Sequence, residues 1–290
     1  MKRSIFIVIL AAIMVLPSFA LSVRKKSIKR LGDGTQTTAV AGNAFKQIID
    51  AYDAEDLGTA NQLVKNYLKK NPNDAVGWAY QAIIQSEMGK SSEALRSMNK
   101  AKDLGIVDRD GNWFYYTRAD INLEVGDTLA AIDDLTMALK FDDKDTDTYY
   151  QRAHLYRKIH MYDEAMVDYG YLVQLDPKEV EGYLGIGAIA SAQNKRDDAI
   201  KAFSMAIKLH PEDADNYAYR ATEYFNAYDY ENSTKDVVSA LEIDRSNKRA
   251  LWVLNYLKEY ALDDVQKIFK KKAKKTKDNY WLDVLNNNDD

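Results

Sequence analysis

The sequence predicts an all-α protein: a right-handed superhelical solenoid of about six helical hairpins with a carboxy-terminal capping helix. Proline is scarce, with 4 in 290 residues, so few positions interrupt a helix. A pattern of small residues also recurs along the chain at spacings of 34, 37, 34, 34 and 34 residues. A repeat of this length is typical of a solenoid built from helix pairs. The recurring small residues are Ala60, Ala94, Ala131, Ala165, Ala199 and Ser233.

Each small residue begins the same local pattern. A large side chain follows four positions later, and a small or aliphatic one follows seven positions later in all repeats but the first. Offsets of four and seven lie on one face of a helix, so we expect this face to pack in the second helix of each hairpin. An aromatic residue stands sixteen positions before the small residue in five repeats, at Trp78, Tyr115, Tyr149, Tyr183 and Tyr217. It marks the first helix.

The amino terminus resembles an export signal. Lys2 and Arg3 precede the apolar run Ile5–Leu16, and small residues follow up to Ala20. We therefore predict a signal peptide over 1–20 and export, to a bacterial periplasm. Basic residues between 24 and 30 oppose translocation, so a chain anchored in the membrane through residues 5–21 remains the alternative.

The rest of the chain divides by the repeat. Residues 21–40 lack periodicity and are predicted to be a flexible linker. The three extra residues of the second repeat are expected in a turn at Asp108–Gly111. Residues 248–290 are predicted to hold a partial seventh repeat, a capping helix and a polar tail, in which Tyr280, Trp281 and Leu285 could dock back. Six repeats are predicted over 41–247, at 41–74, 75–111, 112–145, 146–179, 180–213 and 214–247.

Breaker residues fall at equivalent places. Gly89, Gly126 and Asn194 occupy one position between the two helices, where a left-handed residue commonly ends a helix. Proline stands just after the second helix in three repeats, where it stops the helix. These prolines are Pro72, Pro177 and Pro211.

The pattern resembles the tetratricopeptide repeat (TPR), whose consensus runs aromatic, Leu-Gly, Tyr, Ala, Phe, Ala, Pro. The resemblance covers roughly residues 41 to 247, with a degenerate first repeat. It implies the fold strongly and a particular function weakly, because this scaffold serves many partners. The fifth repeat matches at Tyr183, Gly187, Ala199, Phe203, Ala206 and Pro211, and the fourth at Tyr149, Ala153, Tyr156, Ala165, Tyr169 and Pro177.

Residues for catalysis or metal binding are scarce. The chain has no cysteine and three histidines, which fall in different helices or turns. The acidic run Asp142–Asp147 lacks the glycine and glutamate of a calcium loop and is better explained as a turn that caps the next helix. We expect no enzymatic activity, no cofactor and no metal. A net charge of −4 gives no argument for nucleic acid.

In TPR proteins the first helix of each repeat lines the concave face. The resemblance therefore implies an aromatic groove with a few polar side chains, suited to a partner protein or peptide. Aromatic side chains at the repeat positions that begin each first helix are expected to be structural instead. The candidate groove residues are Tyr80, Trp113, Tyr116, Asp120, Tyr150, His154, Arg157, Tyr219, Phe225, Trp252 and Tyr256.

The sequence thus predicts a non-enzymatic scaffold or adaptor that binds a partner polypeptide. Two alternatives stay open: a self-associating assembly subunit, and the regulatory part of a longer enzyme. The lysines of 270–277 are explained either as solvated cations near a helix carboxy terminus or as a weak contact with a membrane surface or nucleic acid.

Overall fold

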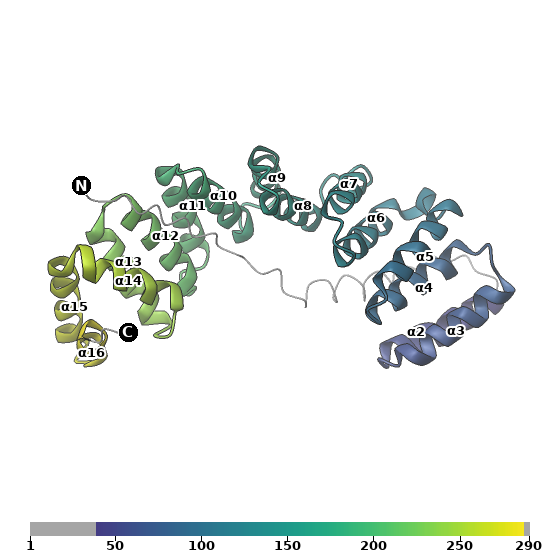
Figure 1. Ribbon diagram of the computed structural model, residues 1–290, viewed down its shortest axis with the longest axis horizontal. Coiled ribbons are helices and arrows are strands. Elements are labelled where there is room, and N and C mark those ends of the chain that lie inside the picture. Colours follow the sequence, from purple (N-terminus) through teal and green to yellow (C-terminus); the bar gives the residue numbers. More distant parts are fainter. Residues whose placement is uncertain (1–38, 287–290) are drawn as a thin grey trace. The chain divides into compact units, whose positions relative to one another are not determined.

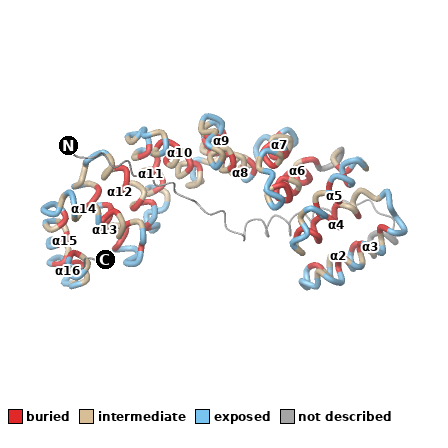
Figure 2. The backbone as a smooth tube through the Cα atoms, in the orientation of Figure 1, coloured by how far each residue is buried: buried red, intermediate tan, exposed pale blue. Residues whose placement is uncertain are grey.

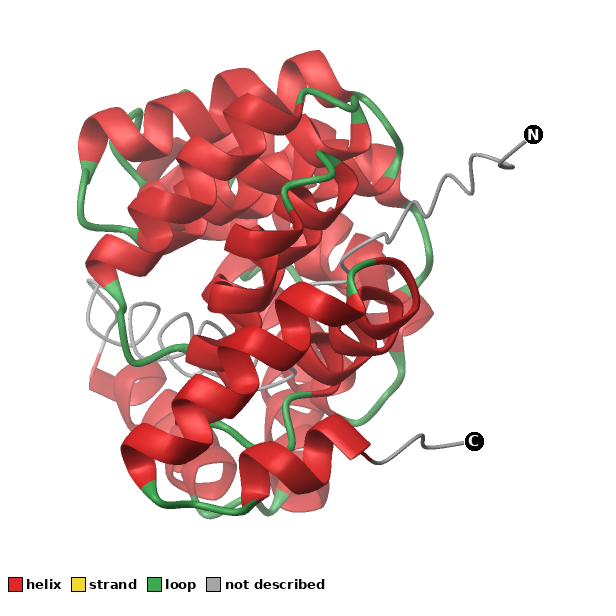
Figure 3. Cartoon of the chain, turned by 90° about the vertical axis from the view of Figure 1, so that its left-hand side faces the viewer, coloured by secondary structure: helices red, strands yellow, loops and turns green. Residues whose placement is uncertain are grey.

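The computed structural model describes residues 39–286, and that part of the chain contains fifteen helices and no strand (Figures 1 and 3). None of the described helices is long and apolar enough to cross a membrane. The helices are α2 (Ala39–Asp53), α3 (Leu57–Lys70), α4 (Ala75–Glu87), α5 (Ser91–Asp103), α6 (Val107–Glu124), α7 (Thr128–Ala138), α8 (Thr146–Lys158), α9 (Tyr162–Leu175), α10 (Val180–Ala192), α11 (Arg196–Leu209), α12 (Ala214–Asn226), α13 (Tyr230–Ile243), α14 (Lys248–Tyr260), α15 (Leu262–Thr276) and α16 (Tyr280–Asn286).

These helices form two compact units, an amino-terminal unit over 39–156 and a carboxy-terminal unit over 157–286. Within each unit, consecutive helices pair as antiparallel hairpins, such as α4 with α5 and α12 with α13. The fold is an all-α TPR-type solenoid, as the repeat predicts. The predicted signal peptide and nearly all of the predicted linker lie outside the described residues. Helix α2 begins at Ala39, so the last two residues of the predicted linker are helical.

The predicted packing pattern is present in the second helix of each hairpin. Ala131, Leu135 and Ala138 on α7 are all fully buried, and the same holds for the equivalent residues of α5, α11 and α13 within a few per cent. Small residues let the paired helices approach, and the large residue between them fills the space. Figure 2 marks the buried positions of these helices in red. The one departure is Tyr67 on α3, which is half-buried and donates a hydrogen bond to Asp74.

The turns between paired helices share one backbone conformation. A residue with positive φ ends the first helix in all six hairpins: Glu55, Gly89, Gly126, His160, Asn194 and Tyr228. The predicted left-handed positions at Gly89, Gly126 and Asn194 are thus confirmed. Aspartate or asparagine at several helix starts accepts a backbone N–H, as Asp74 Oδ1 does from Val76 at 2.9 Å.

The second-to-third repeat junction differs from the prediction. Residues 108–111 form no turn; they belong to the first turns of α6, which is 18 residues long. The three extra residues therefore lengthen a helix. Gly111 makes this possible, because a Cβ atom there would lie 2.3 Å from the Phe141 ring. Glycine often ends a helix, whereas here it leaves room for the Phe141 ring, which follows α7.

Helix α10 tolerates three glycines for the same reason. Added Cβ atoms at Gly182, Gly185 and Gly187 would lie 2.4–2.6 Å from side-chain atoms of Val173, Tyr169 and Phe203, respectively. Glycine costs helix stability, but it lets α9 and α11 pack closely against α10. These glycines are packing residues.

An arginine clamp, which the sequence analysis did not predict, links neighbouring repeats. Arg118 on α6 donates from Nε and Nη2 to both oxygens of Asp134 on α7, at 2.9 and 2.5 Å. Its Nη1 donates to Asn99 of the preceding repeat at 3.1 Å, and Asn122 also donates to Asp134 at 2.8 Å. A bidentate pair of this kind fixes orientation as well as charge.

The same clamp recurs in the carboxy-terminal unit. Arg220 on α12 donates to both oxygens of Asp236 on α13, at 2.7 and 2.8 Å, and to Ser204 of the preceding repeat at 2.9 Å. In the amino-terminal unit, Arg152 also reaches the preceding repeat and donates to Thr136 at 2.9 Å. The recurring Arg and the Asp 16 residues later were visible in the sequence as a pattern, but nothing there showed that they meet.

The carboxy-terminal unit is closed by α15 and α16. Phe269 of α15 is fully buried and meets Trp281 of α16 edge to face, with ring centroids 5.8 Å apart. Leu285 is buried beside them. The segment predicted to dock back therefore does so, as far as Asn286, and the last four residues lie outside the described part.

Candidate protein-binding surfaces

In the amino-terminal unit, the first predicted groove residue is part of the core. Tyr80 on α4 is fully buried, and its ring stacks on Phe45 of α2 with centroids 5.0 Å apart. A side chain without exposed surface cannot anchor a partner, so the prediction for Tyr80 is wrong. Phe45 of the first repeat covers Tyr80.

Three further predicted residues of this unit, all on α6, are also nearly inaccessible. Trp113, Tyr116 and Asp120 expose only 6%, 5% and 5% of their surfaces. Trp113 packs edge to face with Phe114 at 6.1 Å, and burial, followed by the charge of Asp120, raises the pKa of Tyr116 far above its ordinary value. The prediction that these three residues anchor a partner is therefore wrong. They pack beneath the surface of the first-helix face and do not form that surface.

The remaining predicted residues around α8 are half-exposed. Tyr150 and His154 lie one turn apart, with ring centroids 6.4 Å apart. Arg157, at the end of the same helix, is half-exposed and falls in the carboxy-terminal unit. Tyr150, His154 and Arg157 stay predicted groove residues.

The carboxy-terminal unit presents a connected group of rings on α12, α13 and α14. Phe225 is its centre, with centroid distances of 5.6 Å to Tyr230, 6.1 Å to Tyr256 and 6.0 Å to Tyr260. Trp252 joins it through Tyr256 at 4.5 Å, and Tyr228 joins through Tyr230 at 6.3 Å. We call these six residues the aromatic cluster. Its outer members are exposed, Tyr228 by 74% and Tyr260 by 46%.

Tyr228 reaches the cluster from a strained turn. It has a φ of 60° after the end of α12, at the position that two other repeats fill with glycine. The turn is closed by Tyr228 N–H donating to Phe225 at 3.0 Å and Asp229 N–H donating to Tyr224 at 2.9 Å. A bulky residue in this conformation costs about 1–2 kcal/mol. The large exposed ring gains little packing in return.

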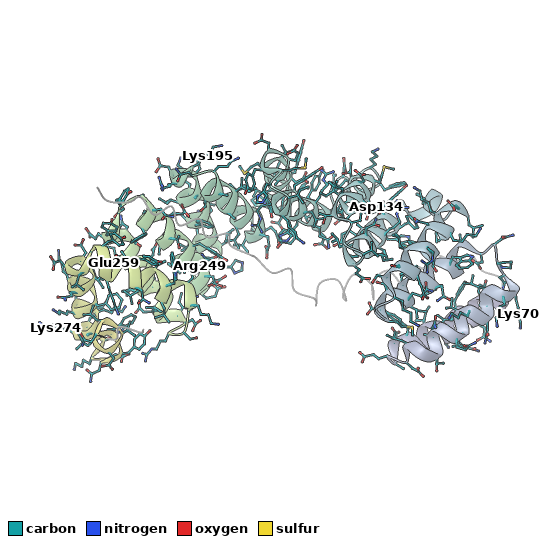
Figure 4. The ribbon with its side chains drawn as sticks, viewed as in Figure 1. Lys70, Asp134, Lys195, Arg249, Glu259 and Lys274 are labelled. Atoms are coloured by element: carbon teal, nitrogen blue, oxygen red, sulfur yellow. The ribbon has the colours of Figure 1, made fainter. Side chains whose placement is uncertain are left out.

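Beside the cluster, Tyr219 on α12 lies between two other side chains. Its ring stacks on Phe203 of α11 with centroids 5.4 Å apart, and the Arg249 guanidinium of α14 lies 4.4 Å from its centroid. Burial, opposed by Arg249, raises the pKa of the Tyr219 hydroxyl. Tyr219 and Arg249 are both half-exposed (Arg249 is labelled in Figure 4). A cation on an aromatic face holds both groups in place.

A buried carboxylate lies in the same helix as Tyr219. Glu223 exposes 3% of its surface and accepts a hydrogen bond from Ser191 of α10 at 2.6 Å. Burial raises the pKa of Glu223, and the Ser191 hydrogen bond and the charges of Arg196 and Arg249 oppose that rise. This arrangement ties α10 to α12 and leaves positive charge near the face that carries Tyr219.

The histidine and acidic side chains singled out in the sequence make local contacts. No group of three or more metal-ligating side chains is present among the described residues. His160 contacts Tyr162 at 2.8 Å, and His210 contacts Glu212 at 2.9 Å. Asp142 accepts the backbone N–H of Lys144 within the turn, and Asp145 accepts the hydroxyl of Thr148 in the first turn of α8.

A family model of the tetratricopeptide repeat matches residues 146–179. This range coincides with the fourth predicted repeat, and further helix pairs flank it on both sides. Residues 146–179 thus match a tetratricopeptide repeat, and the described chain has the TPR-type fold. A search of curated protein sequences gives no match.

Solved TPR structures support this fold. A TPR protein from Parabacteroides merdae is 21% identical, with a TM-score of 0.59, over 90% of this chain and 100% of that one. The carboxy-terminal part of a TPR protein from Cytophaga hutchinsonii is 17% identical, with a TM-score of 0.63, over 82% and 98%. YrrB, described as a TPR protein with an unusual peptide-binding site, is 19% identical, with a TM-score of 0.55, over 65% and 96%. At these identities the likeness shows the fold alone.

Sequence reasoning found Phe225, Trp252 and Tyr256 but missed half of the aromatic cluster. Tyr228 and Tyr230 lie on the turn and second helix of their repeat, and Tyr260 ends α14. The groove residues were predicted only from first-helix positions, which line the groove in TPR proteins. The abundance of tyrosine, 20 residues, was the available signal.

Proposed function

We propose that this protein is a non-enzymatic scaffold that binds a segment of a partner polypeptide against the aromatic cluster of its carboxy-terminal unit. The observation that carries the proposal is the connected network of six rings, of which Tyr228 and Tyr260 are 74% and 46% exposed. Tyrosine and tryptophan bury much surface for little lost rotamer freedom, and they dominate binding energies at interfaces.

The strain at Tyr228 adds independent support. Glycine in the same turn position of two other repeats avoids the cost of a positive φ. Retaining a bulky exposed side chain there lowers stability without filling the core. Glu55, His160 and Asn194 have the same positive φ in the equivalent turns, so the exposed ring of Tyr228, and not the strain alone, supports a contact with a partner.

We further propose that this binding takes place in a bacterial envelope, on the strength of the apolar run at Ile5–Leu16 and the small residues after it. Fractionation of expressing cells would find the chain in the periplasm or, if the run stays attached, in the membrane fraction. Recovery in the cytoplasm alone would contradict this part of the proposal.

Selection of binders from a displayed random peptide library tests the binding site. We expect peptides that bind the wild-type chain to lose at least tenfold in affinity when Trp252 and Tyr260 are both replaced by alanine, since removing two aromatic anchors costs more than 1.4 kcal/mol. Tyr171→Ala is the matched control, because Tyr171 is an exposed tyrosine of the same unit outside the cluster.

Equal affinity of the wild-type chain and the double variant would contradict the aromatic cluster as the binding site. Circular dichroism of both variants separates loss of binding from loss of fold. Light scattering tests the rival hypothesis of self-association: if the purified chain oligomerises and Tyr260→Ala makes it monomeric, the cluster is a self-association surface.

A further inference from the structure

Helix α15 carries lysines on one side along most of its length. Lys267, Lys270, Lys271, Lys274 and Lys275 are all exposed. At 100° per residue these five positions span roughly 140° of the helix surface. The opposite side, at Val265, Phe269 and Ala273, is buried in the core. We call the five residues the lysine face (Lys274 is labelled in Figure 4).

Asp263 and Asp264 are exposed on the same side of α15, in its first turn, and offset part of this charge; the five lysines exceed them by three. None of the five lysines forms an ion pair among the described residues, although Lys270 donates to the neutral Gln266 at 3.1 Å. The sixth lysine of the segment, Lys272, lies on the side of the helix and pairs with Glu242. Glu231 has its pKa lowered by its hydrogen bond to Lys235 and, less, by Lys267, so that carboxylate is already paired.

The helix dipole explains only part of the pattern. Its favourable effect on cations is confined to the last turn, which holds Lys274 and Lys275. Lys267, Lys270 and Lys271 lie earlier in the helix, where like charges three or four residues apart repel one another. Stabilisation of α15 therefore does not account for the lysine face.

We propose that the lysine face binds the anionic headgroups of a lipid bilayer. All five side chains are lysine, a compact point charge that responds to the potential of a membrane surface. Arginine forks and stacking aromatic side chains, which nucleic-acid recognition favours, are absent from this face. Because the apolar side of α15 is already buried, the contact is electrostatic, parallel to the bilayer, and weakened by salt.

This inference is independent of the aromatic cluster and of partner binding. The two surfaces involve different side chains, since the cluster is formed by α12 to α14 and the lysine face by α15. A chain held at a bilayer by one surface would leave the other free to bind a polypeptide.

Vesicle sedimentation of the full chain tests the proposal. Since the apolar run at Ile5–Leu16 would partition into any bilayer, the quantity measured is the ratio of binding to vesicles containing phosphatidylserine over binding to pure phosphatidylcholine vesicles. Each lysine near an anionic surface contributes roughly a fivefold factor in affinity. Replacing Lys270, Lys271 and Lys274 by glutamine should lower the ratio about 10- to 100-fold.

The control variant replaces Lys65, Lys69 and Lys70 of α3 by glutamine. These lysines are equally exposed, and the variant has the same net charge, so its ratio should stay near the wild-type value. An unchanged ratio for the α15 variant would overturn the proposal. So would equal losses in both variants, or tighter binding to duplex DNA than to the anionic vesicles with the same dependence on the three α15 lysines.

Discussion

Tyr80 and Tyr219 occupy the same position in their repeats, the sixth residue of the predicted ranges 75–111 and 214–247. Tyr80 is fully buried against Phe45, whereas Tyr219 is half-exposed between Phe203 and Arg249. The repeat fixes where a side chain points, and the residue contributed by the neighbouring helix decides whether it becomes core or surface. The binding surface of a TPR protein cannot be taken from repeat position alone.

The largest expected effect separates these two tyrosines by stability. Tyr80→Ala should destabilise the amino-terminal unit by ~3–5 kcal/mol, because it opens a cavity under the first repeat. Tyr219→Ala should cost ~1 kcal/mol or less, since its ring is partly in water. Thermal unfolding followed by circular dichroism measures both changes, and equal losses would remove the distinction between the two positions.

The next effect tests the arginine clamp, which both units contain. Asp134→Ala should cost ~3–5 kcal/mol, because it leaves the Arg118 guanidinium without its carboxylate in a largely buried site. Asp236→Ala should cost less, because no counterpart of Asn122 bonds to Asp236. Urea unfolding of both variants provides the comparison. The double variant Arg118→Met with Asp134→Leu should recover much of the loss, and failure to do so would show that the clamp is needed for more than charge balance.

A smaller effect of opposite sign is expected at the turn of the aromatic cluster. Tyr228→Gly should stabilise the carboxy-terminal unit by up to ~1 kcal/mol, because relief of the positive φ exceeds the added entropy of glycine in the unfolded chain. Peptide affinity should fall in the same variant. Asn194→Gly relieves the equivalent turn without altering the cluster, so it should leave peptide affinity unchanged. Equal peptide affinity of Tyr228→Gly and the wild-type chain would show that Tyr228 is not part of the binding surface.

The smallest expected effect is a change in pH dependence. Burial raises the pKa of Glu223 in the folded state, so the stability that its protonated form contributes is present below the unfolded pKa and is lost as pH rises through the folded pKa. Glu223→Gln should flatten this decline above about pH 4.5. Melting temperatures across a pH series would show it, and an unaltered pH profile would indicate that Arg196 and Arg249 fully compensate the carboxylate.

Much of the fold was predictable because it depends on local periodicity. The small residues at Ala131, Ala165 and Ala199 recur in register, and all three are fully buried. Turn chemistry was equally local, since Gly89, Gly126 and Asn194 have the positive φ expected of them. The junction at Gly111 failed because its role depends on the Phe141 ring, which lies 30 residues further along the chain.

The sequence by itself thus determined the helices, their pairing and the residues of the core face, since each follows from spacings within one repeat. Only the tertiary structure decided which aromatic residues reach the surface and which pairs of charges meet. Those outcomes depend on contacts between repeats. Phe45 of the neighbouring repeat covers Tyr80, whereas Tyr228 and Tyr260 are exposed to water.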